Sequence, residues 1–117
     1  MHRRRMTQTP EGRRLPSGVA EAVAILAKEM EPRRIILFGS IARGDGDAES
    51  DLDLLVILDR FDSRFAEMRR ASRALAPLKL PTDVLVYSQA EVDEWGDVVN
   101  HVINEALLDG LVVYDAA

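Results

Sequence analysis

The chain has 117 residues, of which 47% are hydrophobic and 30% are charged, a composition typical of a single globular domain. It contains no cysteine, which excludes disulfides and thiolate metal sites and favours a reducing, cytoplasmic compartment. No apolar run reaches the length of a membrane span, and no apolar segment of a secretory signal follows the basic N-terminus.

The charge of the chain is divided unevenly between its N-terminus and the remainder. The first fourteen residues hold five arginines and one glutamate and carry +4. Because the whole chain carries −5, the remaining residues carry −9. This acidic body argues against stable binding of duplex nucleic acid, because neutralising phosphates requires clustered Lys and Arg. We expect residues 1–16 to be a flexible basic arm and residues 17–117 to form the folded domain.

Hydrophobic periodicity predicts alternating helices and strands in the first half of the chain. Residues 17–30 place apolar side chains on one face of a helix. The apolar run 35–38 predicts a buried strand, and residues 40–43 are expected to form one short helical turn. A loop of small and acidic residues follows at 45–50, and the apolar run 52–58 predicts a second strand.

The same periodicity continues after residue 60. Residues 62–75 predict an amphipathic helix whose apolar face includes Phe65, and 83–87 predict a third strand. A Ser-x-x-Glu capping box predicts a helix that begins at Gln89. Residues 111–114 are expected to add a short edge strand.

The last predicted helix covers residues 97–108. Val98 and Val99 are counted among its buried residues. With this helix, the order of elements predicts a small α/β (α+β) domain, in which helices flank a mixed sheet of three or four strands.

Three acidic residues are the main candidates for chemistry. Asp51 and Asp53 lie two residues apart at a predicted strand, so they share one face with Cα atoms roughly 7 Å apart. Asp83 opens the next predicted strand and joins them if the two strands are neighbours. Carboxylates repel one another unless a cation lies between them, and their hard oxygens suit Mg²⁺. An Asp-x-Asp pair is also common on exposed strands, so solvent-facing aspartates are the alternative interpretation.

A Gly39-Ser40 pair follows the first predicted strand. Glycine lets the backbone approach an anion closely, and backbone N–H groups at a helix start attract phosphate. Ser40 adds a hydroxyl donor, and Arg43 lies one turn further on. A simple turn remains the alternative for this pair taken alone.

These residues together form a spaced pattern. Gly39 and Ser40 are followed after ten residues by Asp51 and Asp53, and Asp83 comes later on a strand. The segments LFGSIARG, SDLDLLV and TDVLVY that carry the pattern resemble the signature of minimal nucleotidyltransferase domains in the DNA polymerase β-like superfamily. The motifs cover about residues 35–87, and the order of elements resembles that family over the whole chain.

The resemblance implies a polymerase β-like nucleotidyltransferase fold and a separate role for each group of motif residues. Two Mg²⁺ ions would be held by the catalytic carboxylates Asp51, Asp53 and Asp83. A nucleoside triphosphate, ATP as the co-substrate, would be bound by Gly39, Ser40 and Arg43. The implied reaction transfers a nucleoside monophosphate to an acceptor hydroxyl and releases pyrophosphate.

The chain has no second domain of the kind that binds the acceptor in larger members of this superfamily, so we expect the acceptor on another protein. Stand-alone domains of this resemblance are typically antitoxins of prokaryotic two-gene toxin–antitoxin modules. Their partner is a helical HEPN-type toxin, which they adenylylate on a tyrosine. The first hypothesis is therefore a Mg²⁺-dependent protein adenylyltransferase that acts as an antitoxin.

Two other functions stay open at this point. The same fold could neutralise its partner by occlusion without catalysis. It could also be a nucleotidyltransferase that modifies a small molecule or an RNA end within a complex. An intact set of three carboxylates argues against the first alternative, and the acidic body weighs against RNA.

Overall fold

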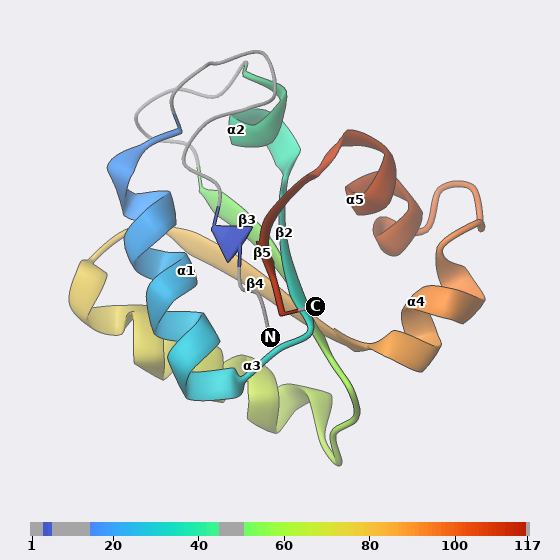
Figure 1. Cartoon of the computed structure of the whole chain (residues 1–117), viewed down its shortest axis with the longest axis horizontal. Coiled ribbons are helices and arrows are strands. Elements are labelled where there is room, and N and C mark those ends of the chain that lie inside the picture. The colour runs from blue at the N-terminus through green and yellow to red at the C-terminus, as the bar shows by residue number, and fades with distance from the viewer. Residues whose placement is uncertain (1–3, 6–14, 45–50, 117) are drawn as a thin grey trace.

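The computed structural model describes residues 4–5, 15–44 and 51–116 as one mixed sheet with helices on both faces (Figure 1). The strands are β1 (Arg4–Arg5), β2 (Arg34–Phe38), β3 (Leu52–Leu58), β4 (Thr82–Ser88) and β5 (Leu111–Asp115). The helices are α1 (Ser17–Met30), α2 (Gly39–Arg43), α3 (Arg64–Leu75), α4 (Gln89–Trp95) and α5 (Val102–Asp109), with a 3₁₀ turn at Ala76–Leu78. None of these helices is long and apolar enough to cross a membrane.

The sheet has the strand order β1-β5-β2-β3-β4. β2 pairs antiparallel with both β3 and β5, and β3 pairs parallel with β4. α3 lies between β3 and β4 in the chain, which is the helical connection that a parallel pair requires. The predicted fold class, a small α/β domain around a mixed sheet, is confirmed.

The sheet is larger than the expected three or four strands, because β1 adds a fifth strand of two residues. Its residues Arg4 and Arg5 pair antiparallel with Asp115 and Tyr114 of β5. The sequence of the arm has no apolar alternation there, so this pairing could not be predicted from it. The division of the chain at residue 16 stays a prediction, since residues 1–3 and 6–14 lie outside the described residues.

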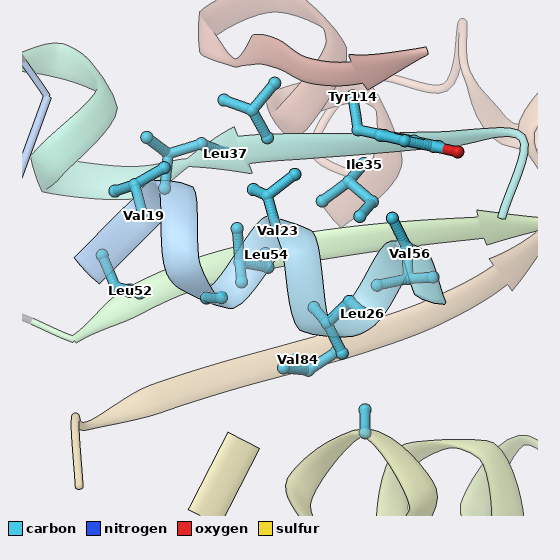
Figure 2. Packing of buried hydrophobic residues seen from close by; sticks show 14 of the residues in the cluster. Val19, Val23, Leu26, Ile35, Leu37, Leu52, Leu54, Val56, Val84 and Tyr114 are labelled. Carbon is cyan, nitrogen blue, oxygen red and sulfur yellow. The ribbon is translucent and has the colours of Figure 1, made fainter. Parts of the chain in front are cut away.

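The larger part of the core lies between the sheet and helices α1 and α3. Figure 2 shows side chains of α1, among them Val23 and Leu26, facing strand residues such as Leu54 and Val56. The apolar residues of α1 recur every three or four positions, and every second residue of β3 points toward α1, so the two elements face each other with apolar side chains. The helix covers Ser17–Met30, the predicted range.

A smaller core lies on the opposite face of the sheet, under α4 and α5. Leu55 and Ile57 of β3 point to this side and pack with Ile103 and Ala106 of α5. Because neighbouring residues of a strand point to opposite faces, β3 is buried on both sides over most of its length. Its continuous apolar run reflects this position in the sheet.

The last helix is shorter than predicted. α5 begins at Val102 rather than residue 97, because Asn100 has a left-handed backbone (φ +71°) and ends the preceding turn. His101 then caps α5, its Nδ1 accepting a hydrogen bond from the Ile103 N–H at 3.1 Å. The predicted burial of Val98 and Val99 is wrong, since both are exposed in the turn between α4 and α5.

Helix α3 also differs from its predicted pattern. Phe65, which the pattern places on the apolar face, is exposed. The inward position of the first turn is occupied by Arg64, whose Nε donates to the carbonyl of Val86 at 2.9 Å. Its guanidinium lies over the ring of Tyr87, 4.6 Å from the ring centre, and pairs with Glu91 of α4. Arg64 therefore links α3, β4 and α4.

Candidate active site

The three acidic candidates come together at the start of the parallel strands β3 and β4. Asp53 lies directly opposite Asp83 in the register of the two strands, whose backbones are about 4.8 Å apart in any sheet. Asp51 precedes β3 by one residue, two positions before Asp53. The Leu52 N–H donates to the Pro81 carbonyl at 3.0 Å, which fixes the two strand starts side by side. The two strands are neighbours, which is the condition under which Asp83 joins Asp51 and Asp53.

The alternation of β3 places Asp53 on the face of the sheet that α4 and α5 cover. Leu52 and Leu54, on either side of it, are buried in the larger core, whereas Asp53 shares its face with Leu55. Asp53 is half-buried, while Asp51 and Asp83 are exposed. The carboxylates thus range from a sheltered position to open solvent, where a substrate can reach them.

Gly39 lies against the carboxylate of Asp53. Its backbone is left-handed, with φ +78°, and a Cβ at this position would overlap Oδ2 of Asp53. Only glycine satisfies both conditions, because it has no Cβ and tolerates positive φ. Phe38, the residue before it, pairs with Asp53 across β2 and β3. The sequence identified Phe38 only as a strand end, and its place beside Asp53 depends on a strand register that the sequence does not reveal.

Ser40 and Arg43 lie on α2, the five-residue helix that Gly39 begins. Ile41 and Ala42 are buried and anchor the helix, whereas Ser40 is half-buried and Arg43 is exposed. Arg43 is near enough to Asp53 for its positive charge to act on that carboxylate. The structure therefore gathers the phosphate-binding candidates and the acidic candidates in one region. The predicted loop at 45–50, which connects them, lies outside the described residues.

The ionisation of Asp53 reflects this environment. Burial raises the pKa of Asp53 above its ordinary value, and the negative charges of Asp83 and Asp51 raise it further, while Arg43 opposes them. The ionised form of Asp53 is therefore disfavoured by both desolvation and like charge. Shifts of this kind, in a group near a surface, are typical of functional sites.

These carboxylates suit a divalent cation by their chemistry. They supply hard oxygen donors, and a cation would relieve the repulsion that raises the pKa of Asp53. Within residues 15–44 and 51–116, however, no three or more His, Asp or Glu side chains are gathered into a group that could hold a metal ion. The two-ion site carried by Asp51, Asp53 and Asp83 stays a prediction.

Comparison with known families decides the assignment of this region. The family described as polymerase beta, nucleotidyltransferase matches residues 21–114, which include the complete pattern from Gly39 to Asp83. The chain belongs to this nucleotidyltransferase family. The predicted resemblance is therefore confirmed.

Two relatives of this nucleotidyltransferase illustrate the family. The "Putative protein adenylyltransferase" of Methanocaldococcus jannaschii is 38% identical over 53 residues, which are 45% of this chain and 52% of the relative. The chain thus matches about half the length of this curated relative. The crystal structure of a "putative nucleotidyltransferase" from Sulfolobus solfataricus superposes with a TM-score of 0.54 and 25% identity. That match covers 79% of this chain and 72% of the other.

The family and the fold of this nucleotidyltransferase are thereby established, and its class of reaction is a transfer. The individual roles of the six motif residues stay predictions. Their placement gives those roles a physical basis, because the half-buried Asp53 is the point where Asp83, Gly39 and Arg43 meet.

Proposed function

We propose that this nucleotidyltransferase transfers AMP from ATP to a hydroxyl group of a partner protein. The observation that carries the proposal is the direct pairing of Asp53 with Asp83 across β3 and β4, with the Gly39 backbone against Asp53. This arrangement sets a group of acids beside a turn that can hold phosphate. The relative named as a protein adenylyltransferase supports both the nucleotide and the kind of acceptor.

The reaction forms one phosphorus–oxygen bond and breaks another. The acceptor oxygen attacks the α-phosphorus of ATP, the bond from that phosphorus to the bridging oxygen of the β-phosphate breaks, and pyrophosphate leaves. The hydroxyl proton passes to a carboxylate, for which we propose Asp83. Asp83 is exposed, so an acceptor arriving from solvent can reach it, and a carboxylate within hydrogen-bonding distance can orient and deprotonate a hydroxyl.

The nucleotide would be held by residues on the other side of Asp53. The backbone at Gly39 offers close approach to a phosphate, and the Ser40 hydroxyl and the Arg43 guanidinium add a donor and a positive charge. Asp51, Asp53 and Asp83 would hold Mg²⁺, which when bound neutralises charge that develops on the α-phosphate and the leaving group. The remaining task of these side chains is positioning, which is the main requirement of phosphoryl transfer.

The proposed biological role is that of an antitoxin. On this proposal the acceptor is a tyrosine of a helical HEPN-type toxin, and addition of AMP inactivates that toxin. Support comes from the family and from the motif resemblance.

A labelling experiment tests the proposal. The protein is incubated with ATP labelled at the α-phosphate, Mg²⁺ and the product of the neighbouring gene, and the partner is analysed by intact mass. We expect the mass of AMP to be added and Asp53→Ala to slow the transfer by at least about 10²-fold, because loss of this carboxylate would disturb the position of the Mg²⁺ and of the reacting groups. Asp59→Ala is the matched control, because this exposed aspartate follows the opposite end of β3. It should leave the rate unchanged.

The alternatives give different results in the same experiment. Neutralisation of the partner that survives Asp53→Ala, with no change of mass, would show that occlusion and not transfer is responsible. Label that appears on RNA or on a small molecule, with none on protein, would replace the proposed acceptor while keeping the transferase.

A further inference from the structure

Exposed apolar residues gather in α4, α5 and the turn that joins them. Five large apolar residues there are exposed, Val99 to 76% and Leu108 to 75%. The full set, called the α4–α5 surface below, is Trp95, Val98, Val99, Leu107 and Leu108. Apolar side chains exposed one at a time are ordinary, but a group of them within one helical hairpin is typical of an interaction site.

Contacts between the two helices hold the α4–α5 surface in one arrangement. The Trp95 ring stacks on His101, with 5.1 Å between ring centres. The Asn104 side chain donates to the Gly96 carbonyl at 2.8 Å, and Leu107 lies within 3.0 Å of the place that a Cβ of Gly96 would take. A partner would therefore meet a surface that is already organised, which lowers the entropy lost on binding.

Acidic residues surround this surface. From residue 80 to 117 the sequence has eight Asp and Glu and no Lys or Arg. Among the acids, Glu94 and Asp97 flank Trp95 along the chain, and Glu105 and Asp109 lie one turn apart beside Leu108; all four are exposed. A protein that covers the apolar centre must bring positive charge to the rim, since like charges across an interface are strongly unfavourable.

The α4–α5 surface lies on the same side of the sheet as the candidate active site. α5 packs against both α2 and β2. At its end, a Cβ on Gly110 would lie 3.1 Å from the Leu37 carbonyl, two residues before Gly39. Figure 1 shows α5 beside α2, with α4 further from it. A protein on this surface would thus be next to the region where Asp53 and Asp83 meet.

We propose that the α4–α5 surface docks the protein substrate, which presents apolar side chains rimmed by Lys and Arg. This inference rests on the proposed function, and it adds where the substrate binds and what chemistry it shows. Helix α3, on the other face of the sheet, also has an exposed apolar residue but carries the opposite charge. The exposed Phe65 there lies on a helix that also carries Arg69 and Arg73, so that surface would suit an acidic partner instead.

The charge and the apolar character can be tested together with a defined probe. The probe is a fluorescent amphipathic helical peptide with Leu on one face and Lys on the others; a second peptide has Glu in place of Lys. We expect the Lys peptide to bind the intact protein, more weakly at high salt. The Val99→Ser/Leu108→Ser double variant should bind it at least about tenfold more weakly, as loss of central anchors does.

Phe65→Ser is the matched control, because Phe65 is a similarly exposed apolar residue (72%) outside the surface. It should leave the affinity unchanged. Reversing the charge of the acidic rim by Glu94→Lys/Asp97→Lys should weaken binding of the Lys peptide, whereas Glu21→Lys on α1 should not. Equal binding of the two peptides, or an unchanged affinity in the double variant, would overturn the proposal.

Two further measurements separate this proposal from its competitors. Sedimentation could show that the intact protein is an oligomer and the double variant a monomer. That result would assign the surface to a second copy of this chain and refute substrate docking. Labelling of the partner with ATP distinguishes failure of the proposed function from failure of the docking proposal. No transfer despite selective peptide binding would refute the transferase and leave the docking surface, whereas normal transfer by the double variant at low partner concentration would refute the docking surface alone.

Discussion

Gly39 and Asp53 form the most constrained pair of residues in the site. The backbone of one occupies the space beside the carboxylate of the other, and the positive φ of Gly39 disfavours other residues even if that carboxylate moved. The carboxylate itself is held in an unfavourable state, since burial and two neighbouring negative charges raise its pKa. Repulsion of this kind is expected where a ligand supplies the compensation.

Substituting Gly39→Ala tests this constraint. The added methyl group must displace the Asp53 carboxylate while the backbone adopts a conformation that costs about 1–2 kcal/mol for a residue with a Cβ. We expect a comparable loss of stability in denaturant titrations and a loss of nucleotide transfer of at least about 10²-fold. Gly18→Ala is the control: Gly18 lies in α1 without a positive φ, and its Cβ would meet only the flexible end of the exposed Leu80 side chain.

Substituting Asp53→Asn tests the repulsion. Ionised Asp53 is penalised in the folded state, so the wild type loses stability relative to the variant as the pH rises through the raised pKa. We expect the metal-free variant to be more stable at neutral pH by about 0.5–2 kcal/mol, the usual range for a stabilising substitution at a functional site.

The gain should vanish below about pH 3.8, the ordinary pKa of the group, because Asp53 is then protonated in the folded and unfolded states alike. Denaturant midpoints across pH measure it, with Glu21→Gln on α1 as the control. A variant that is less stable than the wild type at neutral pH would contradict the interpretation of the raised pKa.

At the scale of elements, Arg64 joins three parts of the fold that meet far from the carboxylates. Its contacts with Val86, Tyr87 and Glu91 connect α3 to β4 and to the first turn of α4. Glu91 also completes the capping box with Ser88. Burial raises the pKa of Glu91, but hydrogen bonds from Arg64 and Ser88 lower it more, so the net shift is downward.

Substituting Arg64→Met is expected to destabilise the protein by about 1–2 kcal/mol, because the Val86 carbonyl loses its Arg64 donor and the Glu91 carboxylate keeps only the donors of Ser88. The effect has a pH signature. The depressed pKa of Glu91 gives stability that is present above about pH 4.5 and is lost as the pH falls through the lowered pKa. Arg64→Met should therefore lose most near neutral pH and flatten the acid limb of the stability curve. Arg69→Met, an exposed arginine on the same helix, should change stability by less than about 0.5 kcal/mol.

Local sequence patterns predicted the components of the site but not their assembly. Alternation in a strand put Asp51 and Asp53 on one face, and the apolar run after Asp83 identified its strand. Whether that strand lay beside β3 depended on a pairing between residues thirty apart, for which a single sequence has no local signal. The left-handed backbone of Gly39 and the place of Phe38 beside Asp53 likewise follow from strand register.

The errors in the predicted elements have a common cause. Periodicity treats every apolar residue as buried, so it extended α5 over Val98 and Val99 and turned Phe65 inward. The structure instead ends the preceding turn at Asn100 and places the Arg64 guanidinium over the rings of Phe61 and Tyr87. Interaction surfaces break the rule that apolar residues are internal, and the exposed valines are part of the surface proposed to dock the substrate.

At the scale of the whole molecule, the charges form two poles. The acidic stretch after residue 80 includes α4 and α5, and arginines concentrate on α3 across the sheet. Such a separation of charge steers the association of charged partners from a distance. The steering weakens as salt is added, because the Debye length is only about 8 Å at physiological ionic strength.

Binding of Mg²⁺ should raise the thermal stability of the whole domain. A ligand that binds only the folded state at ten times its Kd stabilises it by about 1.4 kcal/mol, which raises the Tm of a domain of this size by about 5 °C. We expect this rise with Mg²⁺, its reversal by a chelator, and its absence in Asp53→Asn. Sodium chloride of equal ionic strength is the control. An equal rise in the variant would place the ion elsewhere.

The position of β5 has a consequence for how the chain is made. β5 is synthesised after every other strand, yet it pairs with β2, between β1 and the centre of the sheet. Until the ribosome has passed residue 115, the outer edge of β2 is open, and that edge belongs to the apolar residues Ile35, Ile36 and Leu37. Unpaired apolar edges join those of other chains. Nascent or truncated chains that stop before β5 should therefore aggregate, so the final strand protects the solubility of the sheet as well as completing it.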